Sequence, residues 1–467
     1  MLFSSVTFLY AFLPVVLVLY FAAPKKLKNT VLLLASLFFY YFGERTYTVL
    51  LFISSITDYI WSLLIEKYRG RKFTKWFLVG SLVVNLGLLG FFKYADFFIG
   101  NTNALLGTSI PLTNAHLPLG ISFYTFQTMS YTIDVYRGTA KAQRNLVSFA
   151  TFVCLFPQLV AGPIVRYTDL ASELDERKHT LSQVSKGMLR FAVGLGKKVI
   201  LANAMGEMCR DLTGSGSQSV LMYWIYAAAY ALQVYLDFSA YSDMAIGLGH
   251  MFGFKFPENF NYPFVSKSIT EFWRRWHMTL GSWFRDYIYF PLGGSRTTTW
   301  KWVRNIFVVW MVTGFWHGAE WNFVLWGLYF GVFLMIEKLF LGKWLVKCPA
   351  FVQHIYLLFA VLVSFVIFSV EKLSNLGTYV GGLFGVGGIP LSDARTLYIL
   401  DSFAVVFVLC IVASLPYPKM LWDKFSSTKQ GSVVRAIVDP VVIVVMLLVS
   451  TALLVDGSFN PFLYFRF

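Results

Sequence analysis

Charged residues are scarce in this sequence. Of its 467 residues only 13% are charged, whereas 57% are hydrophobic and 19% are aromatic. A single soluble core cannot hide that much apolar surface, but a bilayer about 30 Å thick accepts apolar runs of roughly 20 residues as transmembrane helices. The composition therefore excludes a water-soluble globular protein and predicts an all-α polytopic integral membrane protein.

Acidic residues are fewer than basic ones, with 24 Asp and Glu against 39 Lys and Arg and a net charge of +15. The basic residues gather in short connections between apolar runs, which is typical of cytoplasmic loops under the positive-inside rule. No basic segment interleaved with aromatics is long enough to fold as a nucleic-acid-binding module. We therefore expect the lipid bilayer as a partner and no nucleic acid.

Motifs for metal, disulfide and nucleotide chemistry are also missing. The four cysteines form no C-x-x-C pair, which predicts small buried hydrophobes rather than a zinc site or a disulfide framework. The GLGKK stretch at 194–198 lacks the spacing of a phosphate-binding loop. No period of 20–50 residues repeats. We expect a single membrane domain over residues 1–467, without a metal.

The apolar runs place candidate spans along the whole chain. The first covers residues 2–23 and leads into a basic loop, which puts the N-terminus outside. Residues 146–165 contain two prolines, so a broken or re-entrant hairpin and a full crossing both remain open, and the re-entrant form places both termini outside. Residues 252–304 are rich in aromatics and Arg and predict amphipathic helices at the cytoplasmic interface. The further candidate spans are 29–43, 47–66, 76–93, 118–136, 187–206, 220–237, 305–318, 321–341, 353–370, 400–416 and 437–455.

A histidine in an apolar neighbourhood is the first candidate for chemistry. His317 lies in VTGFWHGAEWNFVLWG at the end of an apolar run, where a titratable group is costly and marks a functional site. Imidazole takes a proton near neutral pH, and we expect Gly314 and Gly318 to leave space for a substrate hydroxyl beside it. The residues alone equally allow a histidine that is hydrogen-bonded to a neighbouring helix or lies in the interfacial aromatic belt.

A second candidate, His277, lies in the stretch EFWRRWHMTLGSWFRD. A continuous helix is expected there, because a Ser or Thr at position 266, 268 or 270 can cap its start and Glu271 falls in its first turn. At helical spacing one face would carry Trp273, Trp276 and Leu280.

Arginines surround this histidine. Arg274, Arg275 and Arg285, with the Asp286 carboxylate, are expected to form a basic, partly paired rim at the cytoplasmic interface. Because Arg makes bidentate contacts with phosphate oxygens, the rim suits lipid headgroups or the phosphates of a soluble donor such as coenzyme A. Positive-inside anchoring explains each single Arg as well, and both uses remain open.

Two carboxylates and an aromatic tail complete the candidates. Asp237 and Asp243 lie beside an apolar run, and we expect them to pair with Arg or Lys of the cytoplasmic segment, a cation pathway being the alternative. Residues 456–467 end in FNPFLYFRF. This tail either anchors in the interfacial aromatic belt or folds back into a cavity, where the Tyr464 hydroxyl would act as a nucleophile.

Four motifs together resemble the membrane-bound O-acyltransferase family. They are PQLVAGPIVRY at 157–167, YLDFSAYSDMAIGLGHMFGFKFPENFNYPF, EFWRRWHMTLGSWFRDYIYFPLGG and TGFWHGAEWNFVLWG. The resemblance covers nearly the whole chain and is closest to the bacterial branch, which includes alginate-type O-acetyltransferases, cellulose acetylation proteins and the D-alanyl transfer protein of teichoic acids. It implies a ring of about 10–12 transmembrane helices, with re-entrant and interfacial helices, around a central tunnel and funnel.

The resemblance also implies roles for individual residues. His317 corresponds to the invariant family histidine, His277 to the second family histidine, and Phe462, Tyr464 and Phe467 match a C-terminal F-x-Y-x-x-F motif implicated as an acyl shuttle. The implied donor is acetyl-CoA, bound at the basic rim. The implied partners are an extracytoplasmic SGNH-type acetyltransferase and the polysaccharide synthesis and export machinery.

The sequence analysis thus leads to one function and two alternatives. We expect a multi-pass protein of the bacterial inner membrane that moves acetyl groups from cytosolic acetyl-CoA for O-acetylation of an alginate- or cellulose-like extracellular polysaccharide. The alternative enzymatic activity is D-alanyl transfer to teichoic acid from a carrier protein. A solute transporter that uses Asp237, Asp243 and the histidines as a polar pathway is the alternative from another class.

Overall fold

The computed structural model describes residues 1–457. Helices and their connections make up this part of the chain and it contains no strand, which confirms the all-α prediction. The chain divides into two compact units: unit 1 is Met1–Phe191 with Met244–Pro257, and unit 2 is Ala192–Asp243 with Glu258–Phe467. Each unit is described by itself below, and the single domain over 1–467 stays a prediction.

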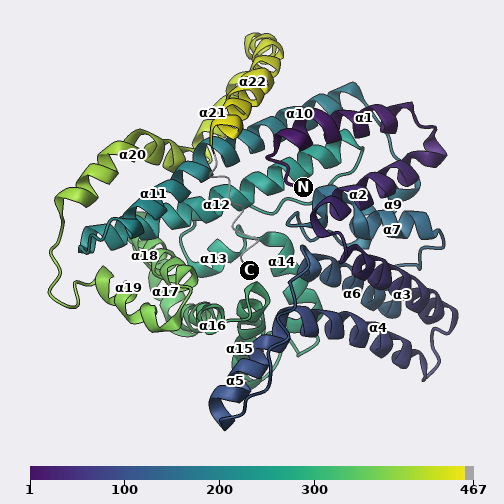
Figure 1. Ribbon diagram of the computed structural model, residues 1–467, viewed down its shortest axis with the longest axis horizontal. Coiled ribbons are helices and arrows are strands. Elements are labelled where there is room, and N and C mark those ends of the chain that lie inside the picture. Colours follow the sequence, from purple (N-terminus) through teal and green to yellow (C-terminus); the bar gives the residue numbers. More distant parts are fainter. Residues whose placement is uncertain (458–467) are drawn as a thin grey trace. The chain divides into compact units, whose positions relative to one another are not determined.

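Unit 1 is built from the N-terminal helices, among which α3 packs against both α4 and α6, and α2 packs against α7 (Figure 1). Its helices are α1 (Leu13–Ala22), α2 (Lys28–Glu44), α3 (Thr48–Lys67), α4 (Thr74–Leu89), α5 (Ala95–Leu106), α6 (Ile121–Arg137), α7 (Leu146–Cys154), α8 (Phe156–Leu159), α9 (Tyr167–Asp175) and most of α10 (Leu181–Gly196).

A buried carboxylate holds three of these helices together. Asp58 on α3 is fully buried and accepts hydrogen bonds from Ser81 Oγ at 2.6 Å and from Asn85 Nδ2 at 2.7 Å, both on α4. The Asn85 Oδ1 accepts in turn from Thr128 on α6 at 3.0 Å. A carboxyl group inside an apolar bundle is costly unless such donors surround it, so this network fixes the positions of the helices.

Unit 2 carries both candidate histidines, and its tightest helix pair is α15 with α16. The helices are α11 (Asn203–Gly214), α12 (Val220–Met251, up to Asp243), α13 (Ile269–Trp273), α14 (Met278–Phe284), α15 (Thr299–His317), α16 (Trp321–Ile336), α17 (Gly342–Leu345), α18 (Ala350–Ser369), α19 (Leu376–Leu383), α20 (Ala394–Ala413), α21 (Tyr417–Ser426) and α22 (Lys429–Asp456).

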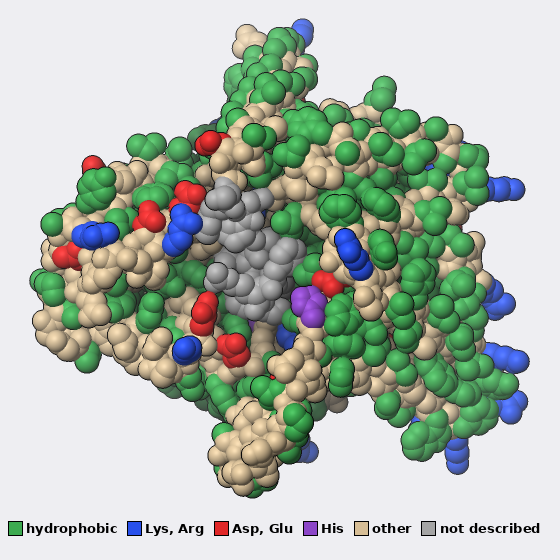
Figure 2. Space-filling view, viewed as in Figure 1, with side chains coloured by type: hydrophobic (Ala, Val, Ile, Leu, Met, Phe, Trp, Pro, Cys, Tyr) green, Lys and Arg blue, Asp and Glu red, His purple; other side chains and the backbone are tan. Residues whose placement is uncertain are grey.

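Six helices of the described chain are long and apolar enough to cross a membrane. They cover Thr48–Lys67, Thr74–Leu106, Trp321–Leu345, Ala350–Ser369, Ala394–Ala413 and Lys429–Asp456. The other predicted spans correspond to helices that are shorter, interrupted or more polar, such as α1, α6 and α12. Helix α22 fits a lipid-facing helix most clearly, because it is strongly apolar and few of its residues are buried. Figure 2 shows green hydrophobic side chains among other atoms on the part that projects at the top.

Residues 146–165 adopt the broken form, one of the two alternatives that the sequence left open. Helix α7 ends at Cys154, and α8 begins at Phe156, one residue before Pro157. Leu155, which joins them, adopts an extended ψ of 110°. Pro157 is tolerated because it lies in the first turn of the new helix, where the N–H that proline lacks would have no helical acceptor.

Candidate functional site

Helix α15 carries His317 at its end, and glycines let this helix pack closely against α16. A Cβ on Gly314 would overlap the carbonyl oxygen of Phe323 on α16, and a Cβ on Gly318 would overlap the Phe323 ring. On α16, a Cβ at Gly327 would likewise overlap the Trp310 carbonyl oxygen. The expectation that Gly314 and Gly318 leave space beside the histidine is therefore wrong, because α16 fills that space in a close helix contact.

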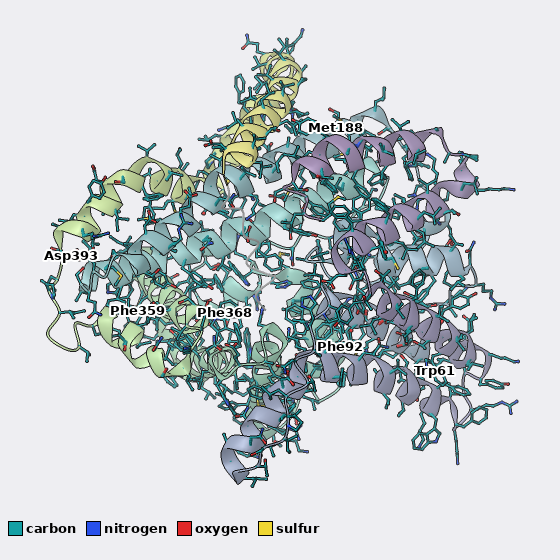
Figure 3. The ribbon with its side chains drawn as sticks, in the orientation of Figure 1. Trp61, Phe92, Met188, Phe359, Phe368 and Asp393 are labelled. Atoms are coloured by element: carbon teal, nitrogen blue, oxygen red, sulfur yellow. The ribbon has the colours of Figure 1, made fainter. Side chains whose placement is uncertain are left out.

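His317 lies in an aromatic environment. Its side chain is buried, and its ring centroid lies 5.0 Å from Trp316, 5.0 Å from Trp326 and 5.7 Å from Phe368. Trp326 comes from α16, and Phe368, labelled in Figure 3, comes from α18. Electrostatic interactions are stronger among buried aromatic rings than in water. A site that excludes water also keeps a transferred proton from passing to solvent.

His277 occupies a break between two short helices. The predicted N-cap is confirmed, since Ser268 Oγ accepts from the Glu271 N–H at 3.1 Å and Glu271 lies in the first turn. The prediction of one continuous helix is wrong, because α13 ends at Trp273 and α14 begins at Met278. His277 has a positive φ of 45°, a left-handed conformation that is uncommon for a residue with a Cβ and is often found at functional sites.

One hydrogen bond fixes the tautomer of His277. Its Nδ1 lies 3.2 Å from Asn259 Oδ1, and that oxygen also accepts from the backbone N–H and the hydroxyl of Thr279. Nδ1 is therefore the donor, which leaves Nε2 as an acceptor. Burial, and then the nearby His317, lower the pKa of His277 well below its usual value, so the ring is neutral at physiological pH.

The two imidazoles belong to one site. Their ring centroids are 6.5 Å apart, and His277 is also buried. Its Nε2 has no hydrogen-bond partner among residues 1–457. Two proton-accepting rings in a buried aromatic environment suit base-assisted attack by a substrate hydroxyl.

The predicted basic rim is partly paired, as expected. Arg275 pairs with Glu271 at 3.0 Å, and Arg285 makes two hydrogen bonds to the Asp286 carboxylate, at 2.7 and 3.1 Å. Arg274 is exposed. Because a surface ion pair adds little stability and opens readily, all three guanidinium groups stay accessible to an anionic ligand.

Both carboxylates beside the apolar run are paired with lysines. Lys198 Nζ lies 2.8 Å from Asp237 Oδ1, and Lys197 Nζ lies 2.7 Å from Asp243 Oδ2. Pairing with a basic residue was predicted, but the lysines come from the π-helical turn Lys197–Ala202 rather than from residues 252–304. Carboxylates neutralised in this way favour a structural role over a cation pathway.

Glu337 is a residue that the sequence analysis missed. This buried carboxylate accepts from the backbone N–H groups of Ile269 and Thr270 at 2.6 and 2.9 Å, from the Thr270 hydroxyl at 2.6 Å and from the Tyr356 hydroxyl at 3.1 Å. It therefore caps the N-terminus of α13, the helix that leads to His277. Glu337 lies 68 positions further along the chain than Ile269 and adds to the local cap from Ser268, so no local pattern indicates its role.

Replacing Glu337 with Gln should lower the free energy of unfolding by about 1.5–3 kcal/mol, because a buried charged acceptor of four hydrogen bonds is lost. Thermal unfolding of the purified variants in detergent measures this. Glu271→Gln is the matched control on α13 itself, where a half-exposed pair with Arg275 predicts a loss below about 1 kcal/mol. Equal losses in the two variants would contradict the capping role.

Tyr464 and the rest of the tail beyond residue 457 lie outside the described residues. Within the described part, no group of three or more His, Cys, Asp or Glu side chains is placed to hold a metal ion. Cys154, Cys209 and Cys410 are buried, as predicted, whereas Cys348 is only half-buried.

Comparison with known proteins shows what the chain is similar to. Residues 139–379 match the membrane-bound O-acyltransferase family. Over its whole length, the chain is 37% identical to a probable alginate O-acetylase from Azotobacter vinelandii, all of which is covered. It is 33% identical to a peptidoglycan O-acetyltransferase from Helicobacter pylori, over 84% of this chain and 81% of that protein. It is 32% identical to a teichoic acid D-alanyltransferase from Bacillus subtilis, over 48% of this chain and 60% of that protein.

Proposed function

Because the chain belongs to the membrane-bound O-acyltransferase family, we propose that it moves acetyl groups from cytosolic acetyl-CoA across the inner membrane of a bacterium. The acetyl groups serve the O-acetylation of an extracellular polysaccharide of the alginate or cellulose type. The protein itself is a multi-pass membrane O-acyltransferase. The observation that carries the proposal is the pair of buried imidazoles, His317 and His277, packed among aromatic side chains.

The chemistry follows from this pair. His317 removes the proton of an acceptor hydroxyl as the oxygen attacks the thioester carbonyl, and a positioned base of this kind contributes about 10²- to 10⁴-fold. Since thioester-to-ester transfer needs no external energy source, the protein has to align the two groups and exclude water. The buried aromatic rings of Trp316, Trp326 and Phe368 support the exclusion of water around His317.

The donor and the partners are part of the proposal. Arg274, Arg275 and Arg285 bind the phosphates of coenzyme A, because guanidinium groups recognise phosphate oxygens with two hydrogen bonds. The acetyl group passes from the membrane protein to an extracytoplasmic SGNH-type acetyltransferase that works with the polysaccharide synthesis and export machinery. The full-length similarity to a probable alginate O-acetylase supports O-acetylation of an alginate-type polysaccharide as the process served.

D-alanyl transfer to teichoic acid is a second candidate, favoured by the 32% identity to a teichoic acid D-alanyltransferase. Its donor is a thioester on a carrier protein, which would dock on the same arginines. The two candidates are distinguished by offering purified protein either acetyl-CoA or a D-alanyl carrier thioester and measuring thiol release. A solute transporter fits less well, because Asp237 and Asp243 are each paired with a lysine.

The first experiment uses protein reconstituted in liposomes with radiolabelled acetyl-CoA. We expect label on the protein itself, and loss of that label in both His317→Ala and Tyr464→Phe, because the histidine would activate the Tyr464 hydroxyl as an acyl shuttle. Label that persists in Tyr464→Phe discards the shuttle and keeps the enzyme. Absence of coenzyme A release, even with an acceptor and the SGNH-type partner supplied, contradicts acetyl-CoA as the donor.

A further inference from the structure

Helix α16 carries two buried polar groups that no residue among 1–457 satisfies. They are the indole N–H of Trp326 and the side-chain oxygen of Asn322, and both residues are 3% exposed. Their positions differ by four, so they lie on the same face of the helix, one turn apart. An unpaired buried donor or acceptor lowers stability, and such a group in a native protein calls for a ligand or another explanation.

Both residues are connected to the surroundings of His317. The Trp326 ring is 5.0 Å from the His317 ring and nearly perpendicular to it, at 83°. Asn322 donates from Nδ2 to the carbonyl oxygen of Phe368 at 3.3 Å, and Phe368 itself contacts the His317 ring. The histidine, the indole donor and the amide acceptor therefore share one aromatic environment.

This combination matches the two groups that meet in acyl transfer. A carbonyl oxygen needs a donor, and negative charge develops on it as the tetrahedral intermediate forms. A hydroxyl needs an acceptor until its proton is removed. Trp326 has an unpaired donor in contact with the His317 ring, and Asn322 has an unpaired acceptor one helical turn away.

We propose that Trp326 is a catalytic residue whose indole N–H binds the carbonyl oxygen of the acyl thioester and stabilises the oxyanion. This proposal rests on the proposed function, because it requires a thioester donor. In the first half of the step, the acceptor oxygen forms a bond to the carbonyl carbon, the carbonyl π electrons move to the oxygen held by Trp326, and the hydroxyl proton moves to His317. In the second half, the carbonyl re-forms, the carbon–sulfur bond breaks, and the leaving thiolate takes the proton from His317.

An indole suits this role in a membrane protein. It donates a single hydrogen bond, carries no charge, and presents an apolar ring to the surrounding aromatics, so no ion has to be buried when the site is empty. The ring packs against Phe368 at 5.1 Å and Trp273 at 5.6 Å, which holds the N–H in one orientation. A fixed donor costs no reorganisation when charge develops on the substrate.

The test removes the donor while keeping the ring. Trp326→Phe is expected to lower kcat by about 10²- to 10³-fold, the effect of deleting one oxyanion donor, with little change in KM or melting temperature. A second variant carries 3-benzothienylalanine at position 326, which keeps the shape of the bicyclic ring but replaces the N–H with sulfur, and the same loss is expected. Trp310→Phe is the matched control, because Trp310 packs against Trp273 at 4.5 Å in the same cluster and is expected to keep kcat within a few-fold.

Each outcome decides the matter. If the benzothienyl variant keeps kcat within a few-fold of the wild type, or if Trp310→Phe loses as much as Trp326→Phe, the oxyanion role is overturned. The assay is run with acetyl-CoA and with a D-alanyl carrier thioester. Activity of the wild type with the carrier alone overturns the acetyl-CoA proposal and leaves Trp326 testable, because both donors are thioesters. Absence of transfer from either donor overturns both proposals.

Discussion

His317→Gln is expected to lower acyl transfer by about 10²- to 10⁴-fold, because glutamine fills much of the imidazole volume but cannot take the hydroxyl proton. The loss should fall on kcat rather than on KM, since the base acts in the transition state and contributes little to substrate binding. Steady-state release of coenzyme A, measured on purified protein in detergent or liposomes, gives both constants.

A histidine elsewhere in unit 2 provides the control. His354 on α18 is half-buried, and its Nδ1 lies 3.0 Å from the Ser266 carbonyl oxygen. His354→Gln is expected to keep activity within a few-fold. If His317→Gln melts at the wild-type temperature and retains more than about a tenth of the wild-type kcat, the role of general base is excluded.

His277 should behave differently from His317. Its pKa is lowered by burial and its Nε2 has no hydrogen-bond partner in the described part of the chain, so we expect His277 to orient a hydroxyl rather than to carry its proton away. Because residues that act as a unit give non-additive losses, the double variant of His277 and His317 is expected to be little worse than His317→Gln alone. A fully multiplicative loss would show that the two histidines act independently.

The sequence sufficed where the determining signal is local. The apolar runs predicted an all-helical membrane protein, and Ser268 was one of three residues expected to cap the start of α13. Two prolines made an interruption of residues 146–165 one of two open alternatives, and the structure shows it near residue 155. The motif around His317 led to the histidine that the structure encloses in aromatic rings. In each case the residues that set the feature lie within a few positions of it.

The rest could not be predicted because it depends on contacts between distant segments. Neither Gly nor Pro separates Trp273 from Met278, so nothing local announces the break at His277, which follows from the bonds of Asn259 to that loop. The sequence predicts open space beside Gly314. Whether a glycine leaves a cavity or lets a neighbouring helix approach closely depends on what packs against it, and at Gly314 helix α16 does so.

The charged pair Lys198–Asp237 carries the second large expected effect. Both side chains are only 4% exposed, and Lys198 Nζ also donates to Asn203 Oδ1 at 2.9 Å. Asp237→Asn leaves the lysine charge buried without its carboxylate, which is expected to cost about 3–5 kcal/mol of stability. Lys198→Met should cost a similar amount for the converse reason.

The double variant Lys198→Met with Asp237→Leu distinguishes structure from function. Replacing a buried ion pair with apolar residues of similar size is often neutral, so the double variant should regain most of the melting temperature lost in either single variant. Asp243→Asn is the matched control, because the Lys197–Asp243 pair is about a fifth exposed and should matter less. If the double variant is as stable as the wild type and transfers acyl groups normally, the pair is structural. A stable double variant without transfer activity would instead place Asp237 in the chemistry and reopen the polar pathway.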